Sequence, residues 1–133
     1  MSKSVPENAL VVVTDGGKAI LFRNAGHGDE VSLKEEQRLT LKDFANDGPS
    51  GSRPQEQTPH QTDEATFAKQ LAHKLFTLHE HKNYEAMVLI ADAQTLGQLR
   101  DAMHKTVANA IVQTMSKDYT NNTTKEIEKA LAA

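Results

Sequence analysis

The segment Leu10–Asn24, LVVVTDGGKAILFRN, sets the architecture of the chain. It begins with an unbroken aliphatic and β-branched run, Leu10–Val13, which is typical of a strand covered on both faces in the middle of a sheet. Asp15-Gly16-Gly17 then favours a tight turn, and a second apolar run, Ala19–Phe22, follows it. The segment therefore predicts two antiparallel strands that form a hairpin.

A third strand is expected after this hairpin. Its apolar residues are all odd-numbered, so we expect them on one face of an extended chain: Val31, Leu33, Leu39 and Leu41. Glu35 and Gln37 interrupt that face, which an exposed middle stretch, a bulge or an edge strand would tolerate.

The segment Asn46–Gln61 reads NDGPSGSRPQEQTPHQ and contains three prolines, two glycines and no aliphatic residue. Such a composition buries too little apolar surface to offset the entropy lost on ordering. We therefore predict a flexible loop, and loops of this length in compact domains are often functional.

Beyond the loop, helical and extended patterns alternate. Three strands followed by this alternation predict an α/β fold with a mixed five-stranded sheet of the ribonuclease-H-like type, in one domain spanning residues 1–133. The predicted elements are a helix from Thr62 to about His81, a strand Ala86–Ala91, a helix capped by Asp92, a strand Ile111–Met115 and a last helix after the Thr123–Glu126 capping box.

Composition narrows the classes of function. The 133 residues carry 15 basic and 18 acidic side chains, a net charge of −3, so we expect no strong binding of free nucleic acid or of an anionic membrane. The absence of cysteine excludes disulfides, zinc–thiolate sites and thiol catalysis. The apolar run Ala9–Val13 is too short for a signal peptide or a membrane span, and we expect a cytoplasmic protein.

Three carboxylates are the strongest candidates for chemistry. Asp15 follows the first strand, Glu64 lies at the start of the first helix, and Asp92 ends the fourth strand. Ribonuclease H enzymes place carboxylates on equivalent elements to bind two Mg²⁺ or Mn²⁺ ions. Each residue also has a structural explanation, as a turn residue, a helix-start acid and an N-cap respectively. We prefer that explanation, expect no metal or other cofactor, and do not count Asp118 as a fourth ligand.

The histidines do not predict a metal site. His79 and His81 are two residues apart on a helix and point in different directions, and His73 is six residues from His79. Arg53 in the loop and Arg100 on the second helix are better candidates for contacts with a partner, because a guanidinium binds phosphate or carboxylate with two hydrogen bonds. We also expect Gly97 to allow close approach of another backbone.

Nearly the whole chain resembles the bacterial host attachment proteins, a family named for a role in the attachment of plant-associated bacteria to host cells. In fold, that family is similar to the middle domain of eukaryotic and archaeal class-one release factors. The segments that carry the resemblance are LVVVTDGGKAILFRN, DGPSGSRP, FAKQLAHKL, YEAMVLIAD, LGQLRDAM and KDYTNNTTKEIEKAL.

The resemblance implies a place for a functional loop. Release-factor middle domains carry a Gly-Gly-Gln tip between the third strand and the first helix, where this chain has Gly51-Ser52-Arg53-Pro54-Gln55 instead. We therefore expect no peptidyl-tRNA hydrolysis. We expect a non-enzymatic binding module that presents Asn46–Gln61, with Arg53, Gln55 and Arg100 as contact residues, to a macromolecular partner.

The resemblance makes the ribosome the candidate partner, with an indirect role in attachment to host cells. The alternative is a metal-dependent nuclease or phosphohydrolase that uses Asp15, Glu64 and Asp92. A third possibility is an extracellular attachment factor, which would need a leaderless export route.

Overall fold

A computed structural model describes residues 5–26, 31–40 and 59–132, with the side chains of 59–66 and 132 left out of the description. Five strands form one sheet in the order β3-β2-β1-β4-β5, which confirms the ribonuclease-H-like mixed sheet. The elements are β1 (Leu10–Thr14), β2 (Lys18–Asn24), β3 (Leu33–Thr40), α2 (Pro59–Glu80), β4 (Met87–Ala91), α3 (Ala93–Ala102), α4 (Lys105–Ala110), β5 (Ile111–Ser116) and α5 (Thr124–Ala132).

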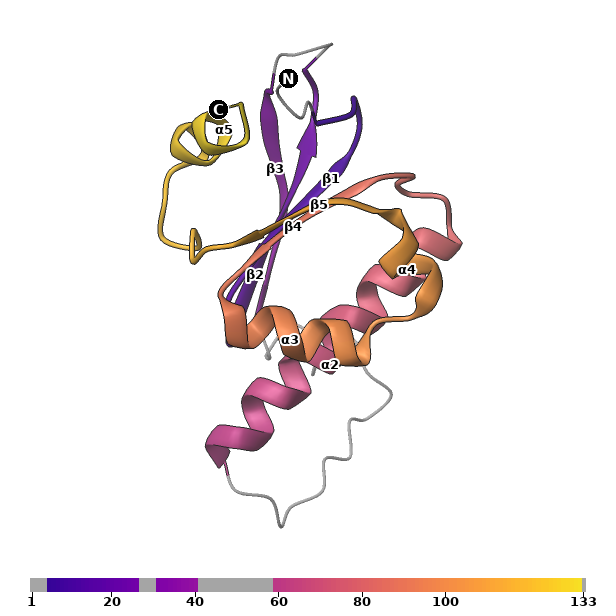
Figure 1. Ribbon diagram of the computed structural model, residues 1–133, viewed down its shortest axis with the longest axis vertical. Helices are drawn as coiled ribbons and strands as arrows, with labels where there is room; N and C mark the ends of the chain where they lie inside the picture. Colours follow the sequence, from indigo (N-terminus) through magenta and orange to yellow (C-terminus); the bar gives the residue numbers. More distant parts are fainter. Residues whose placement is uncertain (1–4, 27–30, 41–58, 133) are drawn as a thin grey trace.

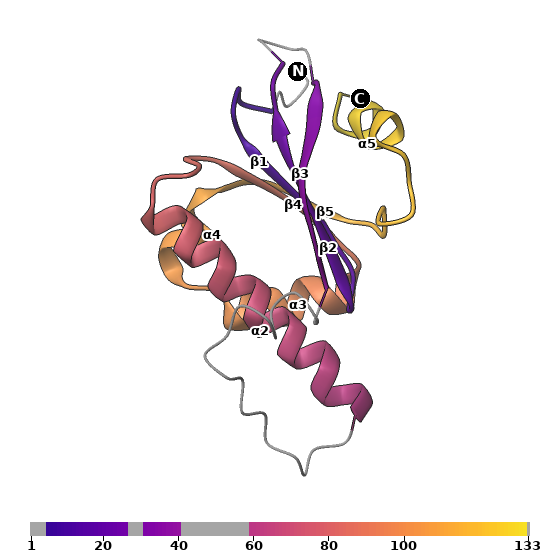
Figure 2. The same cartoon turned by 180° about the vertical axis from the view of Figure 1, so that it is seen from behind.

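The first strand lies in the middle of the sheet. β1 pairs antiparallel with β2 and parallel with β4, so the predicted hairpin is confirmed. Leu10 and Val12 pack on the face covered by α2, α3 and α4, whereas Val11 and Val13 pack on the face covered by α5. The two layers of helices flank the sheet in Figure 1 and in the reverse view of Figure 2. Burial on both faces explains why this strand has no polar alternation.

The expectation of a single apolar face for β3 is wrong. Leu39 packs in the cluster beneath α2, whereas Leu33 packs in the cluster beneath α5. The cause is a β-bulge, because Gln37 pairs with Leu21 and Glu35 pairs with Phe22. Glu36 is therefore an extra residue that reverses the alternation of side chains. Leu41, the last member of the predicted set, lies outside the described residues.

Helix α2 begins at Pro59, which corrects both the predicted end of the loop at Gln61 and the predicted start of the helix at Thr62. Proline suits the first helical position, because its ring fixes φ and that position needs no N–H donor. The remainder of the predicted loop lies outside the described residues.

A Schellman turn ends α2. The Lys82 N–H donates to the His79 carbonyl at 2.9 Å, and the Asn83 N–H donates to the Leu78 carbonyl at 2.9 Å. Lys82 itself takes a left-handed φ of 57°, at a position that glycine usually occupies.

The caps of two predicted helices are confirmed. Asp92 accepts a hydrogen bond from the Thr95 N–H at 3.2 Å, and so caps α3. At α5, Thr123 and Glu126 exchange the two hydrogen bonds of a capping box, at 2.9 and 3.2 Å.

Two features of the region between β4 and β5 differ from expectation. The short helix α4 stands where only a link was expected, because six residues are too few to display a helical period. The predicted close packing at Gly97 is also wrong, since a Cβ at this position would meet no atom within 4 Å beyond its chain neighbours and the backbone of its own helix.

None of the helices in the described ranges combines the length and the apolar character that crossing a bilayer requires.

Candidate functional site

Three aspartates follow neighbouring parallel strands at the same end of the sheet. Thr14 at the end of β1 pairs with Ala91 at the end of β4, and Ala91 pairs with Ser116 at the end of β5. Asp15 and Asp92 come directly after their strands, and Asp118 follows two residues after β5. This end of the sheet is where α/β folds commonly place their sites.

Asp15 holds the β1–β2 hairpin in shape. Its Oδ1 accepts the N–H of Gly17 at 2.8 Å and the N–H of Lys18 at 2.9 Å. These two bonds close an Asx-type turn, as the Asp-Gly-Gly sequence predicted. The structural explanation for one oxygen of Asp15 therefore has direct support.

The second oxygen of Asp15 joins a contact that sequence reasoning did not find. The buried Thr120, which is 4% exposed, places its Oγ1 3.1 Å from Asp15 Oδ2 and 2.7 Å from Asp118 Oδ1. Nearby, Lys18 Nζ donates to Asn121 Oδ1 at 3.0 Å. The segment after β5 is thus tied to the hairpin, about a hundred residues away along the chain. No local pattern signals this contact.

Asp92 serves α3. Besides capping the backbone, it accepts the hydroxyl of Thr95 at 2.7 Å. Glu64 lies near the start of α2, and its side chain is outside the described residues. Within the described part of the chain, no three His, Cys, Asp or Glu side chains stand close enough together to bind a metal ion. The convergence of Asp15, Glu64 and Asp92 therefore stays a prediction.

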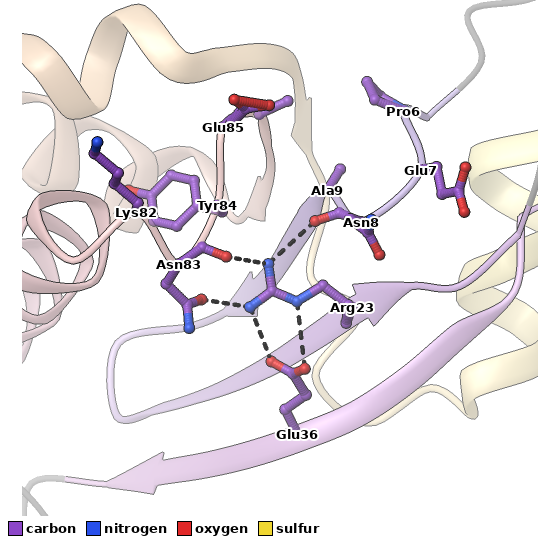
Figure 3. Close-up of a pocket in the computed structure, with 11 residues that line it drawn as sticks. Pro6, Glu7, Asn8, Ala9, Arg23, Glu36, Lys82, Asn83, Tyr84 and Glu85 are labelled. Carbon is purple, nitrogen blue, oxygen red and sulfur yellow. Dashed lines mark hydrogen bonds and ion pairs between the residues drawn. The ribbon is translucent and has the colours of Figure 1, made fainter.

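A cleft of about 630 Å³ lies at the opposite end of the sheet, where β1 and β4 begin. Figure 3 shows Arg23 at its centre, between the segment before β1 and the connection from α2 to β4. Sequence reasoning assigned Arg23 no role. The cleft is lined by Pro6, Glu7, Asn8, Ala9, Arg23, Glu36, Lys82, Asn83, Tyr84, Glu85 and Ala86.

All five N–H donors of Arg23 are used by the protein. Nε and one Nη donate to the carboxylate of Glu36 at 3.3 and 3.2 Å. The other Nη donates to the backbone carbonyls of Asn8 at 3.1 Å and Asn83 at 3.0 Å. The fifth bond goes to Asn83 Oδ1. Because no donor is left over, Arg23 is built to join three segments rather than to bind an anion.

Tyr84 forms part of the cleft wall. Its hydroxyl donates to the Leu75 carbonyl at 2.9 Å, and its ring and the His79 ring pack in a T-shaped arrangement with centroids 5.3 Å apart. Burial raises the pKa of Tyr84 to about 12, so the phenol stays protonated at neutral pH and keeps this bond. The residue anchors the end of α2 to the start of β4.

The predicted contact residues fall into two groups. Arg100 is exposed in the last turn of α3, where a partner can reach it. Arg53 and Gln55 lie outside the described residues. Among the histidines, His73 and His81 are exposed while His79 packs against Tyr84, so the three do not share an environment.

Comparison with solved structures finds a likeness to the crystal structure of the type II variant of the Ppx/GppA phosphatase from Aquifex aeolicus. The match has a TM-score of 0.44 and 13% sequence identity, and covers 83% of this chain. The chain spans 36% of the length of that structure. No curated protein matches.

A family of release-factor-like proteins matches nearly the whole chain. The bacterial archaeo-eukaryotic release factor family 12 matches residues 8–131, which includes every described strand and nearly all of α5. This match confirms the release-factor side of the resemblance, and the host attachment relation stays a prediction. The chain belongs to the bacterial archaeo-eukaryotic release factor family 12.

Proposed function

We propose that this chain is a non-enzymatic module of the translation machinery, with the ribosome as its partner. The observation that carries the proposal is the family match over residues 8–131, which relates nearly the whole chain to release-factor-like proteins. An indirect role in attachment to host cells would follow from altered protein synthesis.

The sequence supports a role without peptidyl-tRNA hydrolysis. The only Gly-Gly pair in the chain is Gly16–Gly17, and Lys18 rather than glutamine follows it. This pair lies in the hairpin that Asp15 closes, so it is committed to the turn between β1 and β2. The chain therefore has no Gly-Gly-Gln tip that could act on the ester bond of peptidyl-tRNA.

The proposed contact surface combines Arg53 and Gln55 with Arg100. Arginine suits a ribosomal partner because its planar guanidinium pairs with phosphate through two parallel hydrogen bonds. The net charge of −3 provides no broad attraction to RNA, so few phosphates would be contacted. We therefore expect binding that weakens less steeply with salt than the binding of a basic protein.

Co-sedimentation with ribosomes from the lysate of the native host tests this function. We expect wild-type protein to sediment with ribosomes at moderate salt, and a variant that lacks Gly48–Gln57 to lose most of that binding. Arg100→Glu should reduce the bound fraction severalfold. Arg38→Glu, an equal change of charge on an exposed residue of β3, is the matched control and should bind like wild type. Absence of wild-type protein from the ribosomal pellet would refute the proposal.

The indirect role in attachment has its own test. Protease treatment of intact cells should leave the protein undegraded while it removes known surface proteins, because a translation-associated module works inside the cell. Rapid loss of the protein under the same treatment would instead support the extracellular attachment factor.

A metal-dependent nuclease or phosphohydrolase that uses Asp15, Glu64 and Asp92 is the second candidate, and one contact of Asp15, with a residue outside that set, favours it. Asp15 and Asp118 both approach the hydroxyl of Thr120, which has a single proton to donate. Two carboxylates so close would attract a divalent cation, and water would have to complete its coordination, since no third described His, Cys, Asp or Glu side chain joins them. Millimolar Mn²⁺ should then broaden the amide NMR signals of Gly16 and Asn121 selectively, and Asp15→Asn should remove the effect. Uniform or absent broadening would eliminate this candidate.

A further inference from the structure

We draw no further inference here: the strongest candidate, the cleft around Arg23 where β1 and β4 begin, belongs to the site already described, and nothing in the structure shows what would occupy it, because the protein itself uses every N–H donor of Arg23.

Discussion

Asp15 and Asp92 illustrate how a residue at a strand end can resemble a catalytic group while serving the fold. Each carboxylate accepts a backbone N–H within three residues of itself, Asp15 in a turn and Asp92 at a helix start. Sequence alone could predict both structural duties, because turn and cap preferences are local. It could not predict that Thr120 joins Asp15 to Asp118, since that contact depends on the path of the chain after β5.

Gly97 carries the clearest prediction for a single residue. It lies in the interior of α3, and beyond its chain neighbours and the backbone of its own helix no atom stands within 4 Å of the position that a Cβ would occupy. Gly97→Ala should therefore raise the free energy of unfolding by about 1 kcal/mol, because alanine loses less backbone entropy in a helix than glycine. Urea unfolding followed by circular dichroism measures the change. A loss of stability would instead show that position 97 needs the space.

At the scale of elements, the sequence predicts best where the pattern is local. Sequence alone predicts the apolar strands and the helix caps, because each depends on neighbouring residues. These are the strands β1, β2 and β4 and the caps of α3 and α5. A bulge in β3 was one of several explanations for Glu35 and Gln37, but neither its presence nor its position could be decided, because an extra residue is defined only against a partner strand. Leu33 and Leu39 are six residues apart and would share a face of a regular strand, but the bulge places them on opposite faces.

The bulge leads to an unusual prediction about a deletion. Removing Glu36 leaves Leu33 and Leu39 five residues apart, which places them on opposite faces of a regular strand, as they already are. The deletion should therefore fold, and its free energy of unfolding should lie within about 1 kcal/mol of that of Glu36→Ala, which loses the same bond to Arg23.

Deletion of Leu89 from the regular, buried strand β4 is the contrasting control and should abolish folding, since it reverses the faces of a central strand. The measurement is thermal unfolding of the Glu36 deletion, Glu36→Ala and the Leu89 deletion. If the Glu36 deletion unfolds as the Leu89 deletion does, the bulge itself is required.

At the scale of the whole molecule, the two ends of the sheet carry different groups of polar residues. The end after β1 and β4 contains the aspartates and the hairpin, whereas the end before them contains the Arg23 cleft. Apart from α4, the order of elements along the chain was predictable, because strands and helices alternate in a recognisable sequence. The cleft was not, since Arg23 unites Asn8, Glu36 and Asn83 from segments that are distant in the chain.

Arg23 should therefore contribute more to stability than an arginine with an equally good ion pair at the surface. Arg38 also binds a carboxylate with two nitrogens, those of Glu35, but its side chain is 63% exposed against 15% for Arg23. Lysine has a single nitrogen and cannot reproduce a five-donor fork. We expect Arg23→Lys to lower the free energy of unfolding by about 2 kcal/mol, because two backbone carbonyls and Asn83 Oδ1 lose their donors.

Arg38→Lys should change the free energy of unfolding by less than about 0.5 kcal/mol, since water and salt screen its pair with Glu35. Urea unfolding of both variants at two salt concentrations makes the comparison. Equal losses would mean that Arg23 acts only through its bond to Glu36. A larger loss for Arg23→Lys that persists at high salt would show that this one side chain holds the N-terminal segment, β3 and the α2–β4 connection together, because its bonds to uncharged acceptors are insensitive to screening.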